Sequence, residues 1–294
     1  MWRKIVNSLI ILFNKACFNP GYLSFSRRGF WNIDEYKQFL SNNIKFSEKM
    51  KILDVGCGIG FLTSLLHDIA PPGTSITGID ISKNNIEYAK KNNKDKNIQF
   101  IESDAYNTDF PNKTFDLIIC QSLFINIAFP GKLLNEMIRV SKNRGIIIGL
   151  EPLVTDLYYF PQFKYINFIF KLHTWFIRLF SSLFKVDRNV TLKLPQLFMD
   201  ANLEDVQVAI YVQLDFLPQH KKIDAVVGEA ASNIKRIKAF KNAGTRSIFR
   251  RILRKSIEEK MGWYQKVIKN PAIIKKTGEI KVNPMLLVKG GKSF

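Results

Sequence analysis

The sequence has few of the residues that build metal and disulfide sites. Among its 294 residues there are three cysteines and three histidines. Cys17, Cys57 and Cys120 lie far apart and form no CxxC pair. This pattern excludes a disulfide framework and a conventional zinc site, so we expect no metal, and it is typical of a protein in the reducing cytoplasm.

Long uncharged apolar runs are also lacking. No segment supplies about 18 uncharged apolar residues, so the sequence predicts no transmembrane span. The N-terminus, MWRKIVNSLIILFNKACF, has a basic start and an apolar middle, but Asn7 and Ser8 interrupt the apolar part and no signal-peptide cleavage site follows. We expect an amphipathic helix there instead.

Acidic residues are scarce relative to basic ones. There are 25 Asp and Glu against 44 Lys and Arg, which gives a formal net charge of +19. Residues 221–281 alone hold 17 basic and 5 acidic residues. Such a concentration suggests an anionic partner, either nucleic acid or an anionic membrane surface, but a solvated helical face is an equally open alternative.

From residue 50 onward, short apolar runs alternate with helical segments. Strands are predicted at 51–56, 74–81, 97–104, 114–122 and 145–152, with helices at 60–70, 84–92 and 132–142. After Pro152 the alternation stops, and a helix at 195–203 and strands at 206–216 and 284–290 complete the pattern. Strands separated by helices need crossover connections, so we expect a doubly wound, mainly parallel α/β sheet of seven strands.

A glycine-rich turn, DVGCGIG at 54–60, joins the first predicted strand to the first helix. This arrangement favours a ligand approaching the start of a helix. The spacing is GxGxG rather than GxGxxG, because Phe61 and Leu62 follow where a dinucleotide fingerprint has its last glycine. Asp80 ends the second strand and Asp104 ends the third, so both carboxylates belong at the same sheet edge as the turn.

The order of these motifs resembles the class I S-adenosylmethionine-dependent methyltransferases, in particular their small-molecule group, which includes quinone and lipid-precursor enzymes. The matching segments are ILDVGCGIG, GIDIS, IESDA, FDLIICQSLF and LLNEMIRVSKNRGIIIGLEP. The likeness is close over about 50–152 and faint over 190–216 and 284–290. SKNRGIII departs from the family's usual Pro-Gly-Gly turn, although Asn143, Arg144 and Gly145 can still supply a turn.

The resemblance implies S-adenosylmethionine as cofactor and gives a role to individual residues. Asp54 would order the glycine loop, Asp80 would bind the ribose, Ile81 would pack on the adenine, and Asp104 would accept from its amino group. The implied cofactor-binding set is Asp54, Gly56, Cys57, Gly58, Gly60, Asp80, Ile81, Asp104, Ala105 and Gln121. Methyl transfer from a sulfonium is an in-line displacement that depends on positioning, and it needs a base only where the acceptor must lose a proton. Glu151 and His173 are the candidates, each with a purely structural role as the alternative.

Basic residues interrupt the aromatic stretch 163–186 at every seventh position, leaving most of the predicted helix apolar. Such a helix packs against the fold, lines an apolar acceptor site, or lies in a membrane interface with the N-terminal helix. We therefore expect N-terminal helices at 1–48, a cofactor-binding core at 49–152, an aromatic lid at 153–190, and the rest of the sheet at 191–294 with a basic helical insertion at 221–281.

The function predicted from these features is transfer of a methyl group to a small, apolar or lipophilic acceptor, in the cytoplasm or at the surface of a membrane. The alternative is methylation of tRNA, rRNA or another nucleic acid through residues 221–281. The fourth strand ends in CQSLFIN, without the Asn/Asp-Pro-Pro-aromatic motif of nucleic-acid amino methyltransferases. That makes nucleic acid the less favoured substrate. The oligomeric state is left open.

Overall fold

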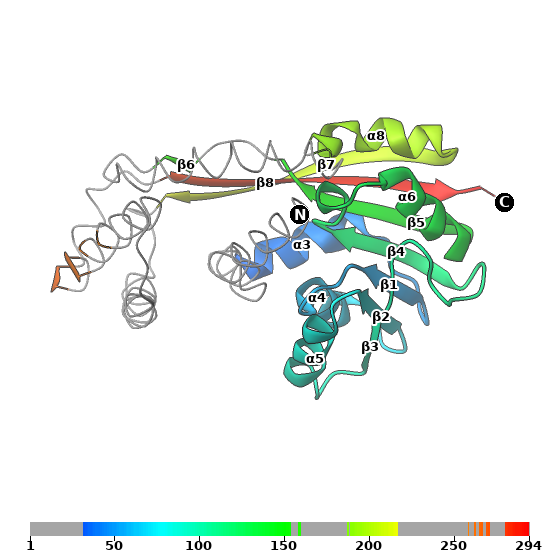
Figure 1. The fold of residues 1–294 in the computed structure, drawn as a ribbon, viewed down its shortest axis with the longest axis horizontal. Helices are drawn as coiled ribbons and strands as arrows, with labels where there is room; N and C mark the ends of the chain where they lie inside the picture. The colour runs from blue at the N-terminus through cyan, green and yellow to red at the C-terminus, as the bar shows by residue number, and fades with distance from the viewer. Residues whose placement is uncertain are drawn as a thin grey trace, which may run out of the picture. The chain divides into compact units, whose positions relative to one another are not determined.

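The structure is a computed structural model that describes residues 32–153, 158–159, 187, 189–216 and 280–293, with isolated positions between 258 and 270 (Figure 1). Several predicted features lie outside the described residues. These are the N-terminal helix, the aromatic helix at 163–186 with His173, and most of the basic stretch at 221–281.

The chain forms two compact units. The first contains Met1–Leu153, Val186–Tyr211 and Pro284–Phe294. The second contains Val154–Lys185 and Val212–Asn283. The glycine-rich turn and the carboxylates predicted around it all belong to the first unit.

The sheet contains the seven predicted strands and one short strand that was not predicted. The seven are β1 (Lys51–Val55), β2 (Ser75–Asp80), β3 (Ile98–Glu102), β4 (Phe115–Gln121), β5 (Ser141–Pro152), β7 (Leu203–Phe216) and β8 (Ile280–Lys292). The eighth, β6, is the two-residue Tyr158–Tyr159. The strand order is β3-β2-β1-β4-β5-β8-β6, and β7 pairs with β8 off this path. Strands β1 to β5 pair in parallel and β8 runs antiparallel to β5, so the predicted mainly parallel α/β sheet is confirmed.

The helices of the described part begin at residues suited to helix starts. They are α3 (Ile33–Asn43), α4 (Phe61–Ile69), α5 (Lys83–Asn92), the 3-10 turn η1 (Phe124–Asn126), α6 (Pro130–Val140) and α8 (Val190–Asp200). Asn32 and Ser82 cap α3 and α5 with their side chains, and Pro130 opens α6, where its missing N–H costs nothing. Helix α8 starts five residues before the predicted 195, because Val190 and Leu194 are buried and this packing outweighs the preference of Pro195 for a first turn.

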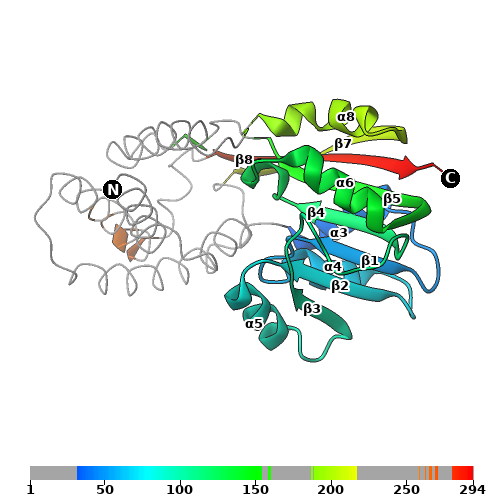
Figure 2. The same cartoon turned by 45° about the vertical axis from the view of Figure 1, so that its right-hand side comes forward.

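Each face of the sheet carries its own hydrophobic core. Alternate strand residues point to opposite faces, so Ile118 and Ile147 join one core while Leu117 and Ile148 join the other. The first core is completed by α6 and α8, and the second by α3 and α4. In both Figure 1 and Figure 2, α8 lies beside β7. The two covered faces leave the ends of the strands as the place where polar side chains can gather.

The segment that departs from the family's glycine turn forms an irregularity in β5. Phe115 pairs with Ser141 but Leu117 pairs with Ile146, so β5 carries extra residues between these two pairs. Arg144 has a φ of 61°, which is the left-handed conformation that a tight turn requires. In place of the turn predicted at 143–145, the structure has this irregularity within β5, with the non-glycine Arg144 in the left-handed conformation.

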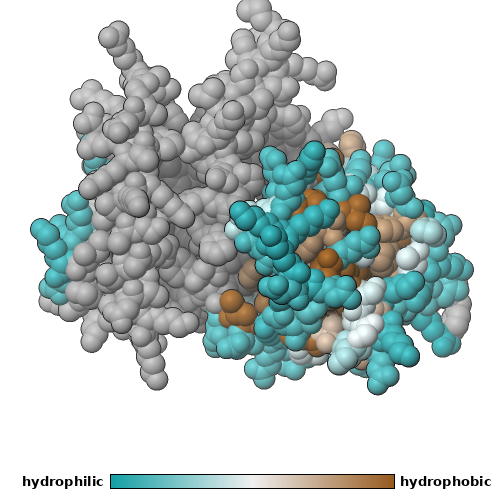
Figure 3. All heavy atoms as spheres, turned by 90° about the horizontal axis from the view of Figure 1, so that it is seen from below, coloured by the Kyte–Doolittle hydropathy of each residue, from teal (hydrophilic) through white to brown (hydrophobic). Residues whose placement is uncertain are grey.

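The face seen in Figure 3 shows a hydrophobic area surrounded by hydrophilic residues. The large apolar side chains that are exposed are Ile33, Ile81, Tyr88, Phe129, Leu192, Met199, Val208, Ile210 and Val212. Among the helices that the structure describes, none is both long and apolar enough to cross a bilayer.

Candidate functional site

Parallel pairing brings the predicted site residues to one edge of the sheet. Val55 pairs with Ile79 and with Cys120, so the glycine turn, Asp80 and Gln121 follow three neighbouring strand ends. Asp80 pairs with Glu102, which places Asp104 just beyond the end of β3. The carboxyl ends of parallel strands are where open α/β sheets bind ligands.

The glycine-rich turn needs glycine at three positions. Gly56, Gly58 and Gly60 have φ angles of 69°, 55° and 82°, which side chains with a Cβ rarely adopt. A Cβ on Gly56 would lie 3.0 Å from Leu123 Cδ1, and one on Gly60 would lie 2.9 Å from Phe100 Cζ. A Cβ on Gly58 would meet no atom within 4 Å. A side chain at Gly56 or Gly60 would therefore crowd its neighbours, whereas Gly58 faces open space.

Asp80 ties the end of β2 to the glycine turn. One carboxylate oxygen accepts a hydrogen bond from the Gly58 N–H at 2.9 Å. The other accepts from the Ser82 N–H at 2.9 Å and from the Asn85 side-chain amide at 3.2 Å. The sequence did not point to Ser82 and Asn85, although a serine just after a strand-ending aspartate is a common helix-start signal.

Asp54 lies beneath the turn and is almost fully buried. Its carboxylate accepts a hydrogen bond from the Thr63 hydroxyl at 2.6 Å, which connects β1 to the first turn of α4. Cys57 is buried beside it, and burial, followed by the charges of Asp54 and Asp80, raises the pKa of the Cys57 thiol. The thiol is therefore neutral and packs with Ile86, Ala89 and Phe100 as an apolar group.

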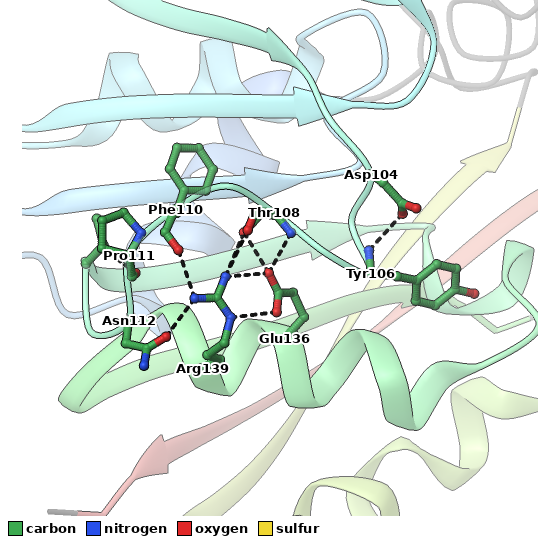
Figure 4. A network of polar contacts seen from close by, with 9 residues as sticks. Asp104, Tyr106, Thr108, Phe110, Pro111, Asn112, Glu136 and Arg139 are labelled. Carbon is green, nitrogen blue, oxygen red and sulfur yellow. Dashed lines mark hydrogen bonds and ion pairs between the residues drawn. The ribbon is translucent and has the colours of Figure 1, made fainter.

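Asp104 begins the loop between β3 and β4. Its side chain accepts a hydrogen bond from the Tyr106 N–H at 2.9 Å, and its carbonyl accepts from the Asn107 N–H at 3.2 Å. The Tyr106 hydroxyl accepts from the Phe129 N–H at 3.2 Å, so this loop is also joined to the start of α6. Figure 4 shows Asp104 and Tyr106 at one end of the loop and a charged network at the other.

That network is centred on Arg139, which projects from α6 into the loop (Figure 4). Its guanidinium donates to the Glu136 carboxylate at 2.7 and 2.8 Å, to the carbonyl oxygens of Thr108 and Phe110, and to the side chain of Asn112. Glu136 also accepts from the N–H and hydroxyl of Thr108. The Arg139 guanidinium lowers the pKa of Glu136 to about 2. Sequence reasoning missed this clamp, because an Arg and a Glu three apart on a helix look like a surface pair.

Gln121 and Ser122 end β4 at the centre of the edge. Gln121 is 7% exposed, and its side-chain oxygen is buried without a hydrogen-bond partner among the described residues. Ser122 has a φ of 57°, an uncommon conformation for a residue with a side chain. Its N–H continues the sheet by donating to the Leu150 carbonyl at 2.8 Å. The backbone then turns sharply into η1.

Glu151, the predicted base in the described part, is fully buried at the end of β5. One oxygen accepts from the N–H groups of Leu123 and Phe124 at 2.8 Å each, and the other accepts from the Ile125 N–H at 3.4 Å. Burial raises the pKa of Glu151 to about 8. These contacts favour a structural role in which Glu151 holds the backbone of residues 123–125, because both of its oxygens are directed at N–H groups rather than at the open edge. His173, the other candidate base, lies outside the described residues.

Comparison with known proteins decides the family. A family model described as a methyltransferase domain matches residues 46–167, the segment that contains every carboxylate and glycine named above. The chain therefore contains a methyltransferase domain of the S-adenosylmethionine-dependent kind over residues 46–167.

The similar proteins include methyltransferases with different substrates. This methyltransferase is 29% identical over 201 residues to a demethylmenaquinone methyltransferase of Geobacillus sp., an alignment that covers 64% of this chain and 83% of that one. It is 28% identical over 130 residues to a sterol 24-C-methyltransferase of Gibberella zeae, covering 43% of this chain but only 34% of that one. A solved phosphoethanolamine N-methyltransferase of Haemonchus contortus has the same fold, with a TM-score of 0.53, 14% identity, and 90% and 54% of the two chains covered.

Three features at the carboxyl ends of the parallel strands fit binding of S-adenosylmethionine, the cofactor of such methyltransferases. Gly58 leaves its surroundings open for close approach of a ligand. Ile81 is 72% exposed directly after Asp80, an apolar surface that an adenine ring would cover. Gln121 supplies a buried acceptor that lacks a partner in the described part of the chain. The residues proposed to hold the cofactor are the predicted set from Asp54 to Gln121.

Proposed function

We propose that this methyltransferase transfers a methyl group from S-adenosylmethionine to a small lipophilic acceptor such as a quinone or sterol precursor. Two of the similar proteins carry names that specify a demethylated quinone and a sterol. The observation that carries the proposal is that Asp80, Asp104 and the glycine turn lie together at the carboxyl ends of β1, β2 and β3. Their polar groups could bind one ligand there. Ile81 and Phe129 add exposed apolar side chains.

The bound cofactor supplies an activated methyl on a sulfonium, so the protein's task is to bind and orient both reactants. Asp80 would accept from the two ribose hydroxyls, exchanging its present bond with the Gly58 N–H for bonds to the ligand. Asp104 would accept from the adenine amino group, and Gln121 would accept from the methionine end. Glu151, the candidate base in the described part of the chain, is directed at backbone N–H groups rather than at an acceptor. This favours an acceptor that loses its proton without a buried general base.

The acceptor is tested by supplying labelled S-adenosylmethionine to the purified protein with demethylated quinones and sterol precursors in detergent micelles. We expect label in the organic extract together with release of S-adenosylhomocysteine. Parallel reactions contain tRNA and rRNA. Label confined to the nucleic acid would contradict the proposal and favour the alternative. The Asp80→Ala variant serves as the inactive control.

We also propose that residues 153–190 cover the acceptor, and that residues 1–18 and 221–281 attach the enzyme to an anionic membrane surface. The support is the sequence alone: an apolar helix with one narrow polar stripe, and 17 basic against 5 acidic residues in 221–281. Flotation with vesicles containing anionic lipid tests this, with neutral vesicles as the control. Loss of flotation on removing residues 1–18 is expected, and failure of the full chain to float would contradict it.

A further inference from the structure

The buried carboxyl of Glu151 and the turn that follows β4 form one unit that the predicted cofactor roles do not include. Glu151 comes from β5, whereas the three N–H groups that it accepts belong to Leu123, Phe124 and Ile125. A single side chain thus satisfies three successive donors at the start of η1. These donors would otherwise be without partners at a helix start.

The turn is held tightly at both ends and is strained between them. Ser122 adopts a φ of 57°, and its carbonyl accepts from the Asn126 side chain at 2.7 Å. On the far side, Phe124 is fully buried, with its ring 6.4 Å from that of Phe198 on α8. A left-handed serine persists only where neighbouring contacts hold it, and the Glu151 bonds to the next three N–H groups are among these contacts.

What the turn positions is the glycine loop. Leu123 lies directly over Gly56, close enough that three of its side-chain carbons are within 3.3 Å of the position of a Cβ there. Gln121, with its unpartnered oxygen, is two residues earlier on the same segment. The chain of contacts therefore runs from Glu151 through the Leu123 backbone to the side chain that packs on the cofactor loop.

We propose that Glu151 is a positioning residue: by accepting the N–H bonds of Leu123, Phe124 and Ile125, it fixes the turn that holds Leu123 against Gly56 and Gln121 at the cofactor edge. The proposal rests on the proposed function in one respect: the ligand toward which the turn is positioned is S-adenosylmethionine. Its contact geometry stands independently of the substrate. Glu151 is fully buried and both of its oxygens face backbone N–H groups, so it is not placed to take a proton from an acceptor at the open edge, and this role replaces that of general base.

The experiment compares Glu151→Ala with Glu151→Gln in two measurements on the full chain. Hydrogen exchange reports the amides of residues 123–125, and calorimetry reports affinity for S-adenosylhomocysteine. In Glu151→Ala we expect exchange at these amides to rise and affinity to fall by about tenfold or more, because three buried donors lose their acceptor. Glu151→Gln should restore both, since its amide oxygen can accept the two short bonds.

Leu40→Ala is the matched control, because Leu40 is fully buried in α3 within a different hydrophobic core from the one that contains Phe124 and Ile125. It should lower stability and leave both measurements unchanged. Leu123→Ala tests the second step even if Glu151→Ala fails to fold: we expect weaker binding with residues 124 and 125 still protected. Unchanged affinity in Leu123→Ala, or an equal loss in Leu40→Ala, would overturn the proposal. Failure of the wild-type chain to bind S-adenosylhomocysteine would instead overturn the proposed function, while amide exchange would still test the hold of Glu151 on the turn.

Discussion

The Asp80 carboxylate accepts a hydrogen bond from the Gly58 N–H at 2.9 Å across the gap between two strand ends. This bond joins the residue proposed to bind the ribose to the loop proposed to enclose the methionine moiety. The same oxygen would be needed by a ribose hydroxyl. Under the proposed role of Asp80, cofactor binding would exchange this internal bond for one to the ligand, and the internal bond holds the loop in place beforehand.

Replacing Asp80 with alanine should weaken binding of S-adenosylhomocysteine by at least about tenfold, because hydrogen bonds to a charged group contribute about 1.5–3 kcal/mol each. Calorimetry measures the affinity. Asp116→Ala is the matched control, since Asp116 also accepts a backbone N–H, that of Lys51 at 2.8 Å, but does so at the opposite edge of the sheet. Equal losses in the two variants would refute the role of Asp80.

Substitution by alanine should mainly lower stability at Gly60 and mainly lower cofactor affinity at Gly58. Gly60→Ala places a Cβ 2.9 Å from Phe100 Cζ and 3.1 Å from Ala89 Cβ, so we expect a loss of about 1–3 kcal/mol in the free energy of unfolding. The Cβ of Gly58→Ala would meet no atom within 4 Å. We therefore expect the free energy of unfolding to fall by only about 1 kcal/mol, because alanine disfavours the left-handed backbone conformation. Its effect should appear in cofactor affinity instead. Denaturant unfolding and calorimetry of both variants check this, and the reverse order of effects would contradict it.

The stability of the protein should fall with rising pH through the titration of Glu151. Its pKa is about 8 in the folded chain against an ordinary value of 4.5, because burial disfavours the charged form. Between these two pH values the unfolded chain has lost the proton and the folded chain retains it, so stability decreases as pH rises. A difference of one pKa unit between the folded and unfolded chains corresponds to about 1.4 kcal/mol in the free energy of unfolding.

Glu151→Gln should remove this slope, since a glutamine has no proton to lose, and urea unfolding at pH 5, 7 and 8.5 measures it. Cys120 is the nearby titratable group on β4. Its thiol stays neutral because burial, followed by the charge of Glu151, raises its pKa. A slope that persists unchanged in Glu151→Gln would show that another group carries it.

Arg139→Lys should loosen the loop that contains Asp104. A lysine cannot reproduce the planar fork that reaches Glu136, Thr108, Phe110 and Asn112 together, so we expect a loss of about 1–3 kcal/mol in stability and a severalfold weaker cofactor affinity. Thermal unfolding and calorimetry provide the measurements. Lys193→Ala is the control, because its ion pair with Asp187 is exposed and such pairs contribute at most about 1 kcal/mol.

The positions of the strands along the chain and the edge of the site could be predicted from the sequence because both depend on local signals. Apolar runs separated by amphipathic segments specify a parallel sheet, and DVGCGIG with Asp80 and Asp104 then falls at one edge. Seven strands were predicted within a few residues of their observed ends. The start of α8 was predicted too late, because burial of Val190 depends on the tertiary fold and leaves no local signal.

The supporting contacts of the site could not be predicted, since each joins residues far apart in the chain. Glu151 bonds to residues 123–125, and Arg139 bonds to residues 108–112. In the sequence, Glu151 is only a carboxylate at a strand end, a position equally suited to a base. The positioning role proposed for it depends on its surroundings, and those surroundings exist only after β4 and β5 have paired.

Strand β8 is synthesised after β5 and β7, yet it pairs with both of them in the sheet. During synthesis, one side of β5 therefore stays unpaired until residues 280–292 have emerged from the ribosome. Lys292 then closes the far end by donating to the carbonyl oxygens of Ile138 and Ser141 at 2.9 Å. A nascent chain with a waiting strand edge is exposed to mispairing with its neighbours, so folding of this enzyme should depend on translation speed and on chaperones.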